Sequence, residues 1–107
     1  MHPALVVRDF IPADLDAVLA LNMHAQDPDA DIPSSLRHYP ALLDIATNFQ
    51  RDGAFLVGIL DGTLIAMGSV SPVEDRTFEM DYIRVAMPHH RNGYGRRVVQ
   101  ELEQRVR

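Results

Sequence analysis

The sequence feature that most constrains the fold is the pair Asp61-Gly62, which lies between two apolar runs. The runs are residues 54–60 (Ala-Phe-Leu-Val-Gly-Ile-Leu) and residues 63–70 (Thr-Leu-Ile-Ala-Met-Gly-Ser-Val). Asp-Gly supplies the two positive-φ positions of a two-residue turn, so the sequence predicts a tight β-hairpin over residues 54–70. Neither run alternates between apolar and polar residues, which indicates a sheet covered on both faces, as in a layered α/β arrangement.

Length and composition favour one compact domain. The chain has 107 residues, of which 47% are hydrophobic and 23% are charged. A chain of this size buries roughly two thirds of its unfolded surface in a single core, so we predict one domain over residues 1–107. No cysteine occurs, which excludes disulfides, thiolate metal sites and cysteine nucleophiles.

Charge and hydropathy argue against nucleic acids and membranes as partners. Fifteen acidic and ten basic residues give a net charge of −5, which repels polyanions on average. No apolar run approaches the roughly 20 residues of a membrane span, and no signal-peptide pattern opens the chain. The sequence therefore predicts a cytoplasmic protein.

The remaining elements follow from periodicity and turn residues. We expect a strand at 4–10, a helix starting at 11–14, a loop at 24–34, a helix at about 35–51, a turn at 71–76, a strand at 77–85 and a last helix from about 93. One face of the second helix is expected to carry Leu36, Leu42, Leu43, Ala46 and Phe49, and Pro40 is expected to kink or divide this helix. This order predicts an α/β (α+β layered) domain with a central, mostly antiparallel sheet of about four strands and helices on both faces.

Residues 85–99 carry the clearest chemical signal. They join the predicted strand to the last helix through a loop that contains Gly93 and Gly95, so backbone N–H groups meet at a helix N-terminus and can bind an anion. Three arginines add positive charge: Arg91, Arg96 and Arg97. A nucleoside-triphosphatase loop is excluded because the chain has no lysine, and a Rossmann loop because the required third glycine and βαβ unit are missing.

This segment resembles the acetyl-coenzyme A signature of the GNAT superfamily of N-acetyltransferases. Residues 90–95 (His-Arg-Asn-Gly-Tyr-Gly) match the signature at both glycines, the second of which is Gly or Ala in the family, with His90 where the family usually has Gln or Arg. Val85 ends the preceding strand at the expected distance. Residues 78–85 resemble the fourth strand of the family and residues 7–15 resemble its opening, so the similarity covers essentially the whole chain.

The resemblance also implies that this chain corresponds to the N-terminal and central part of the fold. Residues 102–107 carry no glycine cap, proline or polar tail, which predicts a truncated domain lacking the usual C-terminal strands and helix. In the family, a further strand forms the second wall of the coenzyme cleft, and a later helix often carries a tyrosine that reprotonates the thiolate. Tyr39, Tyr82 and Tyr94 lie elsewhere, so no thiolate acid can be assigned.

The resemblance implies roles for individual residues around acetyl-CoA, which acts as the acyl donor. The pyrophosphate is expected on the amides of residues 91–96, and the pantetheine arm along the strand backbone, where the Val85 amide would polarise the thioester carbonyl. The expected coenzyme-binding residues are Ile83, Arg84, Val85, His90, Arg91, Asn92, Gly93, Tyr94, Gly95 and Arg96. We expect no metal, because the five histidines lack metal-ligand spacing.

Two carboxylates are candidates for catalysis. The acceptor is expected to be a primary amine of a small molecule or peptide, and such an amine, with a pKa of about 10.4, must lose a proton before it attacks. Glu79 occupies the strand position where many relatives carry a general base, and Asp81 is expected on the same face because strand side chains repeat every second residue. Alternatively, both acids merely face solvent.

Two further readings remain open at this level. A catalytically inactive acyl-CoA-binding or interaction module would use the same glycine loop without acid–base chemistry. In addition, an exposed strand edge beside an apolar helix face favours pairing with a second copy as a homodimer.

Overall fold

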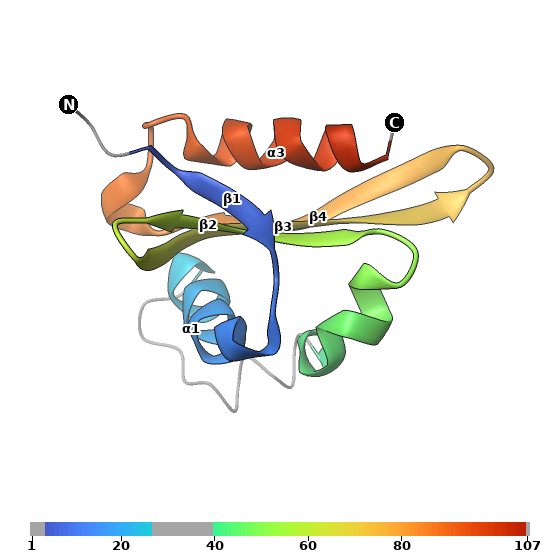
Figure 1. Ribbon diagram of the computed structural model, residues 1–107, viewed down its shortest axis with the longest axis horizontal. Helices are drawn as coiled ribbons and strands as arrows, with labels where there is room; N and C mark the ends of the chain where they lie inside the picture. The colour runs from blue at the N-terminus through green and yellow to red at the C-terminus, as the bar shows by residue number, and fades with distance from the viewer. Residues whose placement is uncertain (1–3, 27–39, 107) are drawn as a thin grey trace.

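The computed structural model describes residues 4–26 and 40–106, which form a layered α+β fold (Figure 1). Its centre is an antiparallel sheet in the order β1-β2-β3-β4, made of β1 (Val6–Asp9), β2 (Ala54–Leu60), β3 (Thr63–Glu74) and β4 (Thr77–Val85). Helix α3 (Tyr94–Arg105) covers one face, and α1 (Leu15–Gln26) lies on the other (Figure 1). The expected fold class is confirmed.

The β2–β3 hairpin forms as predicted. Asp61 and Gly62 have φ values of 51° and 78°, and Leu60 pairs with Thr63 across the turn. Side chains of β2 enter two different cores. Phe55 packs in the cluster between the sheet and α1, and Leu56 packs in the cluster between the sheet and α3. Burial on both faces explains why the strand does not alternate between apolar and polar residues.

The expected second helix is divided into two short segments, and its predicted apolar face is right at Leu42 and Phe49 but wrong at Leu43 and Ala46. A 3-10 helix (Pro40–Asp44) is followed by a π-helical turn (Ala46–Gln50). The buried side chains are Leu42, Ile45 and Phe49, whereas Leu43 and Ala46 are exposed. Packing selects this face, because Phe49 makes edge contacts with the rings of Phe55 and Tyr82, 5.3 and 5.4 Å between centroids. Residues 27–39, which hold most of the expected loop and the start of that helix, lie outside the described residues.

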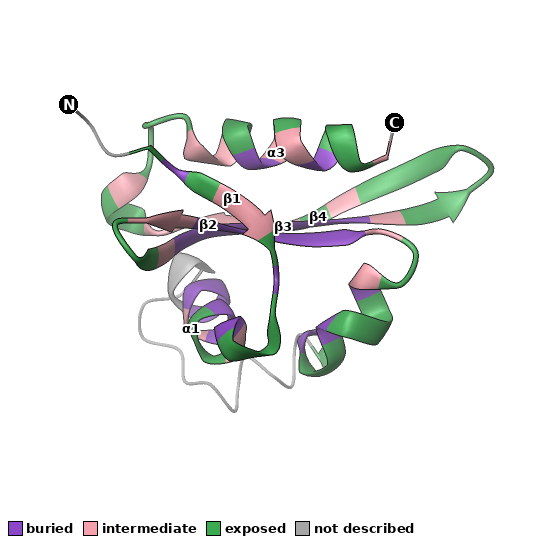
Figure 2. Cartoon of the chain, viewed as in Figure 1, coloured by how far each residue is buried: buried purple, intermediate pink, exposed green. Residues whose placement is uncertain are grey.

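Two other boundaries differ from expectation. The segment predicted as a turn at 71–76 is strand up to Glu74, and the turn consists of Asp75 and Arg76. Pro72, which has no N–H, is tolerated in β3 because β2 ends opposite Val70. Beyond Val70, that edge of β3 has no neighbouring strand to which residue 72 would donate a hydrogen bond. The resulting β3–β4 hairpin projects beyond the body and is mostly exposed (Figure 2).

A bulge in β4 determines which face of the sheet each side chain at the end of this strand occupies. Tyr82 has a φ of 55°, and the register between β3 and β4 shifts at this point, opposite Gly68. A Cβ on Gly68 would lie 2.6 Å from Ile83 Cδ1 and 2.9 Å from Val98 Cγ1, so glycine allows α3 to pack closely over the bulge. Beyond the bulge, Ile83 and Val85 pack against the α3 core, while Tyr82 packs against the opposite core.

Within residues 4–26 and 40–106, no helix is both long and apolar enough to cross a bilayer.

Candidate functional site

The candidate site lies where the chain passes from β4 to α3. A 3-10 turn (Met87–His89) follows β4, and two positive φ values, 67° at Arg91 and 78° at Gly93, turn the chain into the helix. The loop surrounds an open pocket of about 350 Å³. The pocket is lined by Val85, His89, His90, Arg91, Gly93, Tyr94, Gly95 and Arg96.

The pocket receives the N-terminus of α3, which no side chain caps. The bond from the Arg97 N–H to the Gly93 carbonyl, 3.0 Å, is an i→i−4 bond of the first helical turn. The N–H groups of Tyr94, Gly95 and Arg96 precede it and have no intrahelical acceptor. These donors and the positive end of the helix dipole favour an anion, and the exposed Arg91 and Arg96 add charge at the rim.

The two glycines of the loop serve different needs. Gly93 has a φ of 78°, so the backbone conformation itself favours glycine there. Gly95 has no positive φ, and a Cβ on it would meet the protein only at Val85 Cγ2, at an ordinary 3.4 Å. The protein therefore tolerates a side chain at residue 95, and the missing Cβ leaves space on the pocket side. We call this space and the N–H groups of Tyr94, Gly95 and Arg96 around it the cradle, and a group such as a phosphate fits it.

The end of β4 contributes a row of backbone groups beside the pocket. Ala86 donates its N–H to the Ile65 carbonyl on β3, 2.8 Å. Because successive residues of a strand face opposite edges, the N–H and carbonyl groups of Val85 and Ile83 point away from β3. Since β4 is the last strand of the described sheet, these groups face an open edge.

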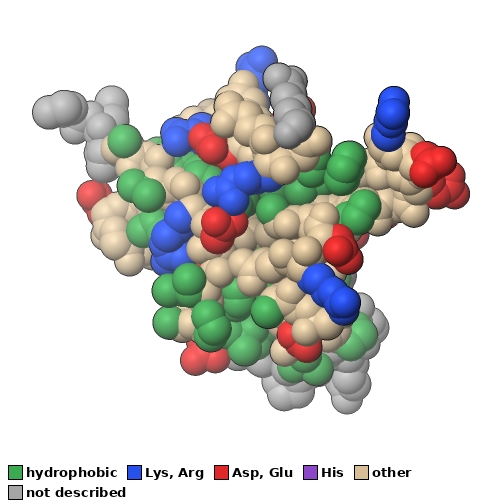
Figure 3. Space-filling model, turned by 45° about the vertical axis from the view of Figure 1, so that its right-hand side comes forward, with side chains coloured by type: hydrophobic (Ala, Val, Ile, Leu, Met, Phe, Trp, Pro, Cys, Tyr) green, Lys and Arg blue, Asp and Glu red, His purple; other side chains and the backbone are tan. Residues whose placement is uncertain are grey.

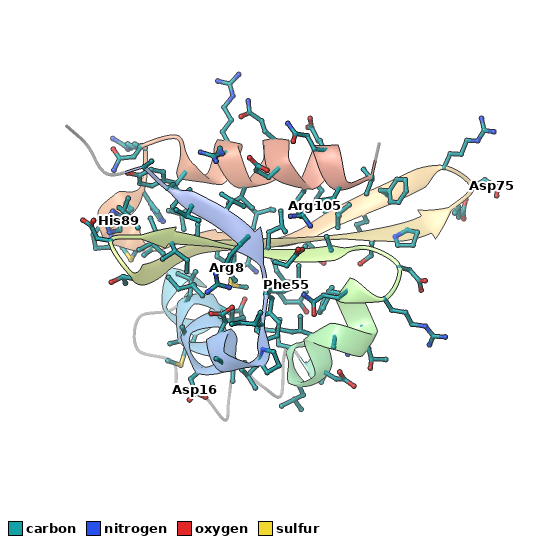
Figure 4. The ribbon with its side chains drawn as sticks, viewed as in Figure 1. Arg8, Asp16, Phe55, Asp75, His89 and Arg105 are labelled. Carbon is teal, nitrogen blue, oxygen red and sulfur yellow. The ribbon has the colours of Figure 1, made fainter. Side chains whose placement is uncertain are left out.

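Seven of the ten expected coenzyme-binding residues meet in the pocket, and three do not line it. Ile83, Arg84 and Asn92 are the three outside: the first two lie along β4 and Asn92 is exposed in the loop. His89 lines the pocket although sequence reasoning did not select it. Its ring lies 6.1 Å from that of Tyr94, and Figure 4 shows it at the end of the molecule opposite Asp75, which lies at the hairpin tip. No sequence pattern distinguished His89 from the other histidines.

Both candidate acids are exposed and share one face of β4. Met80, between them, packs against the α3 core, so Glu79 and Asp81 point to the opposite face, where α1 lies. Asp81 Oδ1 accepts the Tyr82 N–H at 2.9 Å. At about 3.3 Å per residue, Asp81 lies roughly 13 Å and Glu79 roughly 20 Å along the strand from Val85. Asp81 is thus the acid nearer to Val85 and to the pocket at that end of β4.

In the part of the chain that the structure describes, no three side chains of the His, Asp and Glu type come together as metal ligands would.

Comparisons with known proteins agree on one family. The model of the acetyltransferase (GNAT) family matches residues 18–107. An acetyltransferase of the GNAT family from Staphylococcus aureus Mu50 has a similar structure, with a TM-score of 0.85 at 11% identity over 96% of this chain and 66% of that one. A GNAT family acetyltransferase from Brucella melitensis in complex with acetyl-CoA has a TM-score of 0.77 at 17% identity, over 98% of this chain and 70% of that one.

A third solved structure is the ribosomal-protein-alanine N-acetyltransferase from Brucella melitensis, with a TM-score of 0.66 at 22% identity over 94% of this chain and 66% of that one. This chain therefore spans about two thirds of the length of these structures. No curated protein sequence matches it.

Proposed function

Since the chain belongs to the acetyltransferase (GNAT) family, we propose that it transfers an acetyl group from acetyl-CoA to a primary amine. The observation that carries this proposal is the uncapped start of α3, with its open cradle at Gly95, beside the free edge of β4. One Brucella melitensis relative of the same fold is in complex with acetyl-CoA, which supports the same acyl donor here.

We assign the pyrophosphate of the coenzyme to the amides at the start of α3. The N–H groups of Tyr94, Gly95 and Arg96 converge with the helix dipole, and Arg91 and Arg96 offset the phosphate charge. From there the pantetheine arm would run along β4. The outward N–H groups of Ile83 and Val85 lie on this path and can donate to the thioester carbonyl, stabilising the oxyanion that forms when the amine attacks.

The acceptor amine loses a proton before it attacks the thioester carbon. In this proposal the Asp81 carboxylate accepts the proton through bound water, because Asp81 is closer than Glu79 to Val85 along β4 and both acids are exposed to solvent. The new C–N bond forms, the C–S bond breaks, and coenzyme A leaves as a thiolate. The acceptor in this proposal is a small-molecule or peptide amine.

We further propose that a second copy of the chain pairs with β4. Its outer edge is unpaired in the described sheet, and Phe78 is 41% exposed on the projecting hairpin. Figure 3 shows hydrophobic side chains near the base of this projection and acidic ones at its tip. Such pairing is favoured because an open strand edge is a template for another strand.

Acetyl transfer by the full chain tests the activity directly. Radiolabelled acetyl-CoA is incubated with a panel of polyamines, amino sugars and peptides, and label in the amine is measured. We expect transfer that is strongly reduced in Gly95→Val, whose side chain fills the cradle. If wild type binds coenzyme A but acetylates no amine, the chain is an acyl-CoA-binding module and the proposed activity is wrong.

A further inference from the structure

Two side chains of the chain itself occupy the outward carbonyls at the end of β4. His90 Nε2 lies 2.6 Å from the Val85 carbonyl oxygen, and Arg84 Nη1 donates to the Ile83 carbonyl at 3.0 Å. These are the two consecutive outward carbonyls beyond the bulge, as the bond from Ala86 to Ile65 establishes. Since a carbonyl oxygen only accepts, His90 must carry its proton on Nε2 to make this bond.

We propose that Arg84 and His90 cap these carbonyls, so that the coenzyme end of β4 offers a ligand N–H donors alone. An ordinary strand edge alternates donors and acceptors, and this one has lost its free acceptors at Ile83 and Val85. The identity of the ligand rests on the proposed function. The two residues act as specificity-determining positioning groups, not as acid–base catalysts.

The caps have opposite effects on different parts of a ligand. Oxygen atoms, such as a thioester carbonyl, can use the remaining N–H donors without disturbance. The amide N–H groups of a pantetheine arm need carbonyl acceptors, so they must displace His90 or Arg84 before pairing. The caps also prevent another strand from pairing with β4 beyond the bulge. Strand pairing with a second copy is therefore confined to the outer part of β4, which we define as residues 77–81, before the bulge.

The two capping side chains belong to different segments of the chain. Arg84 belongs to β4 itself, whereas His90 belongs to the loop after the Met87–His89 turn. His90 therefore ties the loop to the strand, and its release would change the edge without removing any amide of the α3 cradle.

His90→Ala tests the proposal, and the variant is compared with wild type at pH 8.5. Binding is followed by NMR titration with two probes: coenzyme A, and adenosine 3′,5′-bisphosphate, which carries phosphates but no pantetheine arm. We expect coenzyme A to bind about threefold to tenfold more tightly, the range of one hydrogen bond that no longer has to be broken. Adenosine 3′,5′-bisphosphate, which has no arm to compete with His90 for the Val85 carbonyl, should not bind more tightly.

His89→Ala is the matched control, because it removes an imidazole from the same pocket but no cap. It should not tighten coenzyme A binding. Unchanged or weaker coenzyme A binding to His90→Ala overturns the proposal, since His90 would then not compete with the arm.

A measurement without ligand separates this proposal from the proposed function. In wild type at pH 8.5, ¹⁵N NMR of the imidazole should show the Nε2–H tautomer of His90. The Nδ1–H tautomer would overturn the capping. If neither probe binds while the Nε2–H tautomer is present, the capped edge stands and the coenzyme assignment fails.

Discussion

The guanidinium of Arg8 donates two hydrogen bonds to the carboxylate of Asp14, 2.7 and 2.9 Å long. Asp14 is only 8% exposed, and its Oδ2 also accepts the Ile11 N–H at 3.0 Å. The hydrogen bond from Arg8 lowers the pKa of Asp14, although burial acts in the opposite direction. This pair joins β1 to the start of α1 and thereby helps to hold α1 against its face of the sheet.

Asp14→Asn should destabilise the protein at neutral pH and much less in acid. Because the pKa of Asp14 is lowered by folding, its contribution is present above the pKa of the unfolded state and is lost as pH falls through the folded value. We expect a loss of about 1–2 kcal/mol in the free energy of unfolding at pH 7, limited by solvent screening of the partly exposed Arg8. Urea unfolding at pH 7 and pH 3 measures it. An equal loss at both values would contradict the charge-based explanation.

The glycine pair in the loop should separate folding from binding. Gly93→Ala places a side chain at a φ of 78° and should destabilise the protein by about 1 kcal/mol. Gly95→Ala should leave the melting temperature unchanged within a degree or two, about what a few tenths of a kcal/mol produces. Gly95→Val should weaken coenzyme A binding, because its larger side chain fills the cradle. Thermal melts and NMR titration of the three variants test this. Equal binding by wild type and Gly95→Val would remove the cradle from the site.

Gly68→Ala should destabilise the contact between α3 and the sheet. The new Cβ would meet Ile83 Cδ1 at 2.6 Å and the stiff Val98 side chain at 2.9 Å, and we expect a loss of about 1–3 kcal/mol. Adding Ile83→Val removes one of the two contacts and should recover part of the loss. Denaturant unfolding of the single and double variants measures the coupling. No recovery would show that the strain does not lie at Ile83.

The two acids of β4 should differ in their effect on acetyl transfer. Asp81→Asn is expected to lower the rate by about 10²-fold to 10⁴-fold near pH 7, with partial recovery at higher pH as free amine accumulates. Glu79→Gln, two residues farther from Val85 along β4, is the matched control and should lose less than about tenfold by the same measure. Rate–pH profiles of the three proteins decide it. A larger loss in Glu79→Gln would assign the base to Glu79.

Strand pairing should depend on the outer part of β4. We expect light scattering to show a homodimer for wild type, and Phe78→Lys to shift it towards monomer, because a charge on an edge strand opposes pairing. Circular dichroism verifies that the variant is folded. A wild-type chain that is monomeric at all concentrations would refute the dimer.

Local signals predicted the elements whose conformation depends on adjacent residues. Asp61-Gly62 fixes its turn through the φ preferences of two residues, and Gly93 does the same at the start of α3. The extent of β3 was missed because a proline usually ends a strand. Only the position of β2, which ends opposite Val70, shows that the missing N–H of Pro72 breaks no hydrogen bond of the sheet. The buried face of the Pro40–Gln50 segment was predicted only in part, because aromatic packing around Phe49, not a regular α-helical repeat, determines it.

The sequence alone determined the layered class, the hairpin and the glycine loop, since turn chemistry and apolar runs act between near neighbours in the chain. The tertiary structure alone decided the bulge at Tyr82, the approach of Val98 to Gly68 and the hydrogen bond from His90 to Val85. Each of these depends on where the sheet and α3 come together, and that placement is the sum of many contacts between residues that no local pattern connects.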